Sequence, residues 1–253
     1  MLRLYHLFLG ALVIAVLTPL GLMQAFSKLS LNHKSQRPPT VQTSAPQKQG
    51  QTTATNSQPA QVNIWKSILG KTAAPSGWAV AACEGSAPLL CVTSQGKLLG
   101  TVEMGIYPLE KQPNFQNMLA QSGIPTGSNI DYQSPKYQTQ VASALKLWIA
   151  DHYSVLAKDR QGEYSDKVTF SSQPPHKLEV GKLQGMRYGF AGLKKQGGVH
   201  EEHRGYVAFD GKALYVIKTA FDTASETGRF EKLENFQSFE PHLSAIVKDV
   251  KLP

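Results

Sequence analysis

The sequence has no acidic residue in its first third. All 18 Asp and Glu residues lie at or after Glu84, whereas seven of the 26 Lys and Arg residues lie before it. The remaining 19 basic residues nearly balance the acidic ones, so the net charge of +8 belongs to the N-terminal third. A nucleic-acid-binding protein concentrates positive charge on its binding face. The globular part has no such excess, and we expect no nucleic-acid partner.

A second absence is that of charge in residues 7–26, which form an apolar run. A helix of this length spans about 30 Å, the thickness of the hydrocarbon core of a bilayer. We therefore predict that residues 1–26 contain an N-terminal transmembrane helix that anchors the protein in a membrane. The alternative is a cleaved signal peptide and a soluble secreted domain. No cysteine follows the run where a bacterial lipoprotein anchor requires one, which argues against lipid attachment.

Residues 27–63 lack aromatic side chains and any periodicity, and they are rich in Gln, Thr, Ser and Pro. Such a segment cannot bury enough apolar surface to offset the entropy lost on ordering. We predict a disordered linker that, as a flexible coil, would separate the membrane from the domain by about 35 Å.

Residues 64–253 are predicted to form one globular domain. An apolar stripe at helical spacing predicts a helix over residues 136–158 that ends at Gly162. His152 lies on this stripe and is expected as a hydrogen-bonded histidine at the edge of the core. Shorter helices are expected near residues 64–69, over 114–121 and after Pro241.

Patterns of apolar and β-branched residues predict strands at 77–83, 89–93, 98–107, 164–173, 177–193, 199–209 and 213–221. The strand over 164–173 is expected to stop at Pro174 and Pro175. Asp210 and Gly211 are typical of a hairpin turn. Because runs of strands are separated from the helices, the pattern predicts an α+β fold, with a largely antiparallel sheet packed against helices.

The residues from Leu178 to Phe239 resemble the PsbP family of extrinsic photosystem II proteins. The pattern consists of GMRYGF at 185–190, GGVH at 197–200, YVAF at 206–209, DGK at 210–212, LYVI at 214–217 and SF at 238–239. The resemblance implies an α/β/α sandwich and a non-catalytic binding or assembly module on the exported side of a membrane. Residues 77–135 do not align with the family.

Cys83 and Cys91 flank a turn between two predicted strands, so their side chains could meet across a hairpin. A disulfide needs Cα atoms about 4.4–6.8 Å apart. In an exported domain we expect the pair to be bonded. Two buried, reduced thiols are the alternative, which is expected if the domain faces the cytosol.

Residues 200–203 read His-Glu-Glu-His and form the densest group of metal-ligand types in the sequence. On a strand, His200 shares one face with Glu202, and Glu201 shares the other with His203. Zinc takes three or four ligands, so a site built on His200, Glu202 or His203 would need His176 or His242 as well. We favour a solvated polar strand end and predict no metal or other cofactor.

No phosphate-binding loop, dinucleotide fingerprint, nucleophile elbow or recognisable carboxylate pair occurs in the sequence. We therefore predict that the protein is not an enzyme. A hydrolase with a scattered site remains the least favoured alternative.

The charges around residues 7–26 leave the topology open. Arg3 precedes the run, whereas Lys28, Lys34 and Arg37 follow it, and this balance would place the domain in the cytosol. The cysteine pair and the family resemblance favour export to a periplasm or thylakoid lumen. We predict a tethered assembly module for a membrane protein complex, which could be photosynthetic. The alternative is a ligand or metal carrier.

Overall fold

The computed structural model describes residues 62–125 and 130–252. The predicted anchor, and the predicted linker up to residue 61, lie outside the described residues. Within the described residues, no helix combines the length and the apolar character needed to cross a bilayer. Asn63, expected at the end of the linker, is fully buried in the folded region.

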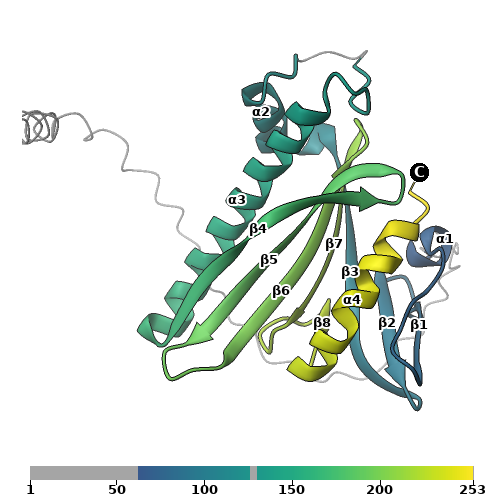
Figure 1. Cartoon of the computed structure of the whole chain (residues 1–253), viewed down its shortest axis with the longest axis vertical. Coiled ribbons are helices and arrows are strands. Elements are labelled where there is room, and N and C mark those ends of the chain that lie inside the picture. The colour runs from purple at the N-terminus through teal and green to yellow at the C-terminus, as the bar shows by residue number, and fades with distance from the viewer. Residues whose placement is uncertain (1–61, 126–129, 253) are drawn as a thin grey trace, which may run out of the picture. The chain divides into compact units, whose positions relative to one another are not determined.

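The core of the fold is one sheet of eight strands in the order β1-β2-β3-β8-β7-β6-β5-β4 (Figure 1). Neighbouring strands are antiparallel except for the short β7–β8 pair, which confirms the largely antiparallel sheet. The strands are β1 (Trp78–Ala82), β2 (Leu89–Ser94), β3 (Lys97–Pro108), β4 (Val168–Val180), β5 (Leu183–Lys194), β6 (Val199–Phe209), β7 (Ala213–Phe221) and β8 (Arg229–Phe230).

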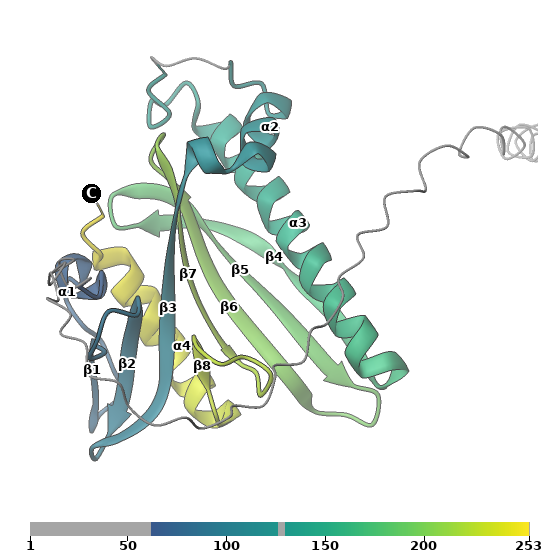
Figure 2. The ribbon, with the colours of Figure 1, turned by 180° about the vertical axis from the view of Figure 1, so that it is seen from behind.

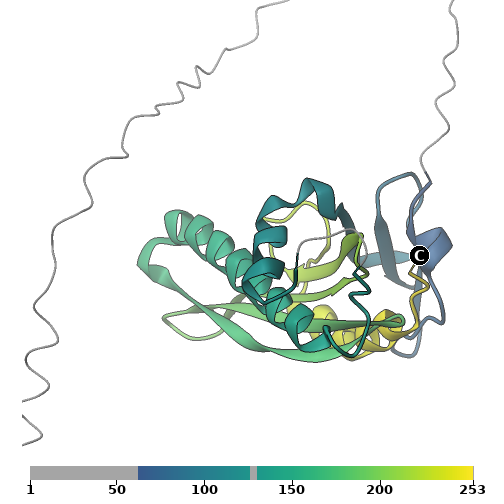
Figure 3. The same cartoon turned by 90° about the horizontal axis from the view of Figure 1, so that it is seen from above.

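Helices cover both faces of this sheet (Figures 2 and 3). They are α1 (Trp65–Ile68), α2 (Pro113–Gln121), α3 (Gln138–Tyr164) and α4 (Leu233–Asp249). The helices α1 and α4 bury one apolar cluster against the sheet, and α2 and α3 bury a second cluster on the opposite face. The arrangement is helix, sheet, helix, which is compatible with the predicted α+β fold.

Strand β7 shows why two helical layers are needed. Leu214 and Val216 belong to the cluster under α3, whereas Tyr215 and Ile217 belong to the cluster under α4. Successive strand residues point to opposite faces, so a continuous apolar run buries both sets only when both faces are covered.

Strand β4 does not stop at Pro174 and Pro175, contrary to the prediction. It continues to Val180, and its pairing with β5 shifts register between Gln173 and His176. Because β4 is the outermost strand, a missing proline N–H on its free edge costs no hydrogen bond of the sheet. The register shift accommodates the missing hydrogen bond on the side that faces β5. The single strand predicted over 177–193 is also wrong, since Gly181, with a φ of 58°, turns the chain into β5.

Two helix boundaries differ from those predicted. Helix α3 passes Gly162 and ends at Tyr164, because one glycine costs a helix only about 1 kcal/mol. Helix α4 begins at Leu233 and includes Pro241. Apolar residues on both sides of this proline are buried against the sheet, and this packing holds the helix together despite the lost hydrogen bond.

The β1–β2 hairpin is closed by the predicted disulfide. Cys83 and Cys91 are bonded, with their Cα atoms 5.0 Å apart. The side chain of the buried Asn63 fastens the hairpin to α1. Its Nδ2 donates to the carbonyl oxygens of Cys83 and Leu89, and its Oδ1 accepts from the amide of Trp65.

Removing the disulfide is expected to lower stability. The bond closes a loop with a sequence separation of eight, which corresponds to about 2–3 kcal/mol of unfolded-state entropy. The variant Cys83→Ser with Cys91→Ser should lose this much in urea unfolding of the full chain. Reduction of the parent protein should give the same loss, and unchanged stability in both cases would contradict the prediction.

Candidate functional site

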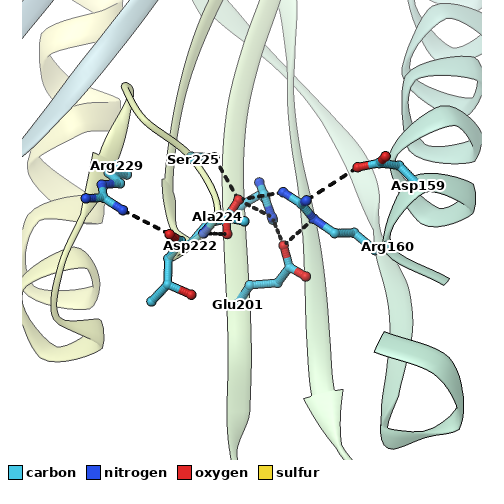
Figure 4. Close-up of polar contacts among 9 residues, drawn as sticks. Asp159, Arg160, Glu201, Asp222, Ala224, Ser225 and Arg229 are labelled. Carbon is cyan, nitrogen blue, oxygen red and sulfur yellow. Dashed lines mark hydrogen bonds and ion pairs between the residues drawn. The ribbon is translucent and has the colours of Figure 1, made fainter. Parts of the chain in front are cut away.

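A cluster of charged side chains lies between α3 and the end of β7 (Figure 4). It consists of Arg160 from α3, Glu201 and His203 from β6, and Asp222, which directly follows β7. We call these four residues the charge cluster. They bring two carboxylates, an imidazole and a guanidinium into direct contact.

The strand geometry explains how the cluster forms. Glu201 and His203 are two residues apart on β6, so both point toward α3. The register of β6 with β7 places Glu202 opposite Phe221, which brings the next residue, Asp222, beside Glu201. The chain turns sharply there, because Oδ1 of Asp222 accepts from the amide of Ala224 at 2.8 Å.

The contacts within the cluster are short. Arg160 donates from Nη2 to Oδ2 of Asp222 at 2.8 Å and from Nε to Oε2 of Glu201 at 3.3 Å. Nε2 of His203 lies 2.6 Å from the same Oε2 of Glu201 and 3.9 Å from Oδ2 of Asp222. A carboxylate only accepts, so this Nε2 carries the hydrogen.

Both carboxylates are removed from water, since the side chains of Glu201 and Asp222 are each 1% exposed. Burial by itself raises the pKa of Asp222, but bonds from Ser225 and the Ala224 amide, with the charges of His203 and Arg160, hold it below its usual value. Burial likewise opposes the charge of Arg160, and the two carboxylates raise its pKa. The positive charge of Arg160 therefore offsets part of the negative charge of the two buried carboxylates.

Three members could also ligate a metal ion. Donor atoms of Glu201, His203 and Asp222 lie within 4.8 Å of one another. One imidazole and two carboxylates form a ligand set that zinc accepts. The guanidinium of Arg160 already bridges the two carboxylates, so an ion would have to displace it. Oε1 of Glu201 is buried without a hydrogen-bond partner among the described residues.

The structure separates the residues singled out in the sequence. His203 belongs to the cluster, whereas His200 lies against the ring of Tyr164 with centroids 4.4 Å apart. Glu202 is on the opposite face, 3.5 Å from Arg204. The two suggested helpers lie elsewhere, His176 on β4 and His242 on α4.

Glu201 and Asp222 were not among the metal candidates. The two-residue repeat of a strand had already placed Glu201 and His203 on one face. The sequence therefore indicated two of the four residues of the charge cluster. Asp222 and Arg160 come from other elements, and nothing local in the sequence links them to β6.

His152 lies at the edge of the core, stacked on Trp148 with ring centroids 5.2 Å apart. Burial, followed by the charges of Lys218 and His203, lowers its pKa to about 4. His152 is therefore neutral near pH 7.

Acid is expected to destabilise the protein through Asp222. Because its pKa is lowered in the folded state, the ionised carboxylate stabilises the fold above the usual pKa of about 4. That contribution is lost as the pH falls through the folded-state value. Urea unfolding between pH 6 and pH 3 should show a weaker pH dependence in Asp222→Asn than in the parent. The exposed Asp151→Asn should follow the parent, and equal slopes for all three proteins would contradict the assignment.

Comparison with known proteins adds a similarity to solved structures. No protein-family model matches the chain, and no curated protein matches it. Among solved structures, the chain is similar to the solution structure of cyanobacterial PsbP from Synechocystis. The TM-score is 0.35 and the identity 8%, over 71% of this chain and 84% of the other. No conclusion about family or function follows from a similarity of this size, and the resemblance of residues 178–239 to PsbP stays a prediction.

Proposed function

We propose that the protein is an exported, membrane-tethered domain that binds a membrane protein complex without catalysing a reaction. The observation that carries the proposal is the disulfide between Cys83 and Cys91. Disulfides persist in oxidising compartments and are rare in the cytosol. Together with the apolar run at 7–26, the bond supports a domain on the far side of a membrane.

An uncovered part of the sheet supports a binding role. The helices α2 and α3 pack on the β4–β7 half of their face, and in Figure 2 no helix stands in front of β2 or most of β3. Ala79 and Ala81 are exposed on this side, and Cys91 and Thr93 are half-buried. The β1 and β2 part of this face presents small, uncharged side chains, with Glu103 of β3 beside them, and such a surface suits contact with another protein. The resemblance to PsbP makes photosynthetic complexes the first partners to test.

Thiol labelling of intact cells tests the location. In the proposed topology, a membrane-impermeant maleimide labels Cys83 and Cys91 only after an external reductant is added. The variant Cys83→Ser with Cys91→Ser is the control and should stay unlabelled. Rapid labelling by a cytosol-restricted reagent without reductant would place the domain in the cytosol and overturn the proposal.

Capture of the partner tests the role. The full chain, tagged at its C-terminus and solubilised in mild detergent, should co-purify with a membrane complex. Ala81→Arg introduces a charge into the uncovered face and should reduce recovery of that complex, whereas Lys158→Glu on α3 should not. Equal recovery with both variants would reject the face as the binding surface.

A second candidate function is binding of a divalent cation by the charge cluster. The unpartnered Oε1 of Glu201 favours it, because a buried carboxylate oxygen without a donor is costly. Calorimetric titration of the full chain with zinc chloride should then show one site that His203→Gln weakens and His242→Gln leaves unchanged. Absence of binding would remove this candidate.

A further inference from the structure

A small cavity lies beside the charge cluster, between α3, the middle of β6 and β7, and the loop at residues 225–228. Its volume is about 120 Å³. Arg160, His203, Tyr188, Lys218 and His152 are among the residues that line it. The cavity thus shares Arg160 and His203 with the charge cluster, whereas Glu201, Asp222 and the residues of β1 and β2 do not line it.

The cavity exists because one position in the sheet has no side chain. Tyr188, Gly205 and Lys218 lie in one row across β5, β6 and β7. A Cβ atom at Gly205 would overlap the ring and the hydroxyl of Tyr188. The tyrosine ring therefore lies across β6, and its hydroxyl points along the row toward the strand position of Lys218.

The hydroxyl of Tyr188 is the unexplained group in this cavity. The residue is 3% exposed, and its ring meets the rings of Trp148 and His152 edge to face. Its hydroxyl is buried and has no hydrogen-bond partner among the described residues. A buried hydroxyl without a partner costs free energy that binding of an acceptor would recover.

Basic side chains line the cavity, and those of Arg160 and His203 already contact the buried carboxylates of Glu201 and Asp222. The lining residues include Arg160, His203 and Lys218 but, within the part of the chain that the structure describes, no Asp or Glu. Glu103 lies just outside, 3.6 Å from the ammonium of Lys218. Because the Lys218 side chain is 45% exposed, water screens its ion pair with Glu103, and an anion in the cavity can compete for the ammonium.

We propose that this cavity binds a small oxyanion of the carboxylate or phosphate class, with the Tyr188 hydroxyl as hydrogen-bond donor and the Lys218 ammonium as counter-charge. The anion accepts from Tyr188, which leaves no orphaned donor in the wall. The cavity is large enough for an acetate- or phosphate-sized ion and too small for a nucleotide. This site does not depend on the proposed docking to a membrane complex.

Calorimetric titration of the full chain in detergent micelles tests the proposal. Sodium phosphate and sodium acetate are the two probes, each at constant ionic strength, and their relative affinities identify the class. Tyr188→Phe removes only the hydroxyl and should weaken binding about tenfold, the value of one hydrogen bond. Lys218→Gln should weaken it at least as much. Lys212→Gln, an exposed lysine in the β6–β7 turn, is the matched control and should bind like the parent.

Stability measurements keep the result interpretable. Because Tyr188→Phe removes an unpartnered hydroxyl, its unfolding midpoint without the anion should equal or exceed that of the parent. Added anion should raise the midpoint of the parent more than that of the variant. Lack of binding by both anions would overturn the proposal, and so would binding that neither Tyr188→Phe nor Lys218→Gln changes.

Discussion

Replacement of Arg160 by Met is expected to lower the free energy of unfolding by about 3–5 kcal/mol. The guanidinium contacts the carboxylates of Glu201 and Asp222, and both are almost completely buried. Without it, the two buried carboxylates lose the guanidinium that contacts both of them. Urea unfolding of the full chain at pH 7 measures the loss. Because α3 and β6 supply the partners, the loss should appear in the cooperative transition of the whole domain.

A more exposed arginine provides the control. Arg187 lies 3.5 Å from Glu240, and its side chain is 36% exposed. Glu240 also forms an ion pair with Arg204 at 3.1 Å, so it keeps a partner when Arg187 is removed. Arg187→Met should therefore cost less than about 1 kcal/mol. Combining Arg160→Met with Glu201→Gln and Asp222→Asn should recover part of the stability lost in Arg160→Met. Similar losses for Arg160→Met and Arg187→Met would show that burial does not determine how much the charge cluster contributes to stability.

Replacement of Asn63 by Ala is expected to cost about 2–4 kcal/mol. Its fully buried side chain satisfies two carbonyl oxygens of the β1–β2 hairpin and the amide of Trp65. The Cys83 carbonyl and the Trp65 amide would lose this partner, at a cost of about 1–3 kcal/mol for a buried group left without one. The Leu89 carbonyl keeps the amide of Cys83 at 2.9 Å. The unfolding midpoint of the full chain in urea should fall accordingly.

Two further variants test the assignment of this role. Asn63→Asp keeps the acceptor for the Trp65 amide but loses both donations to the hairpin, so it should be nearly as damaging as Asn63→Ala. The exposed Asn117 on α2 is the control, and Asn117→Ala should be neutral. If Asn63→Ala were also neutral, Asn63 would contribute no more to the stability of the domain than a linker residue does.

Much of the fold could be predicted from local patterns. The strands β6 and β7 match the predicted ranges, because an apolar run with a hairpin turn at Asp210 and Gly211 specifies both strands and their register. The errors occurred where tertiary contacts override a local signal. Pro174 and Pro175 are accommodated in β4 only because no further strand pairs with its outer side, and Pro241 is held in α4 by the packing on both sides of it.

The candidate site was less predictable than the fold. The alternation of side chains along β6 predicted that Glu201 and His203 share one face. His200 and Glu202 were considered as metal ligands without regard to which helix covers each face of the sheet. Arg160 lies 41 residues before Glu201 and 62 before Asp222. Only the packing of α3 on the sheet brings them together, and a single sequence carries no signal for that distance. Asn63 was missed for the same reason, because its partners are 20 and 26 residues away.

The pairing of β3 with β7 has a consequence for how the chain acquires its structure. The two strands come from opposite halves of the domain, and Thr219 bonds to the carbonyl of Thr101 across 118 residues. During synthesis, β1–β3 emerge as a three-stranded ribbon whose β3 edge has no neighbour until β7 has been made. Contacts this distant in sequence form slowly, and an open edge invites aggregation. Early oxidation of the cysteines would keep the ribbon's first hairpin in register during this wait.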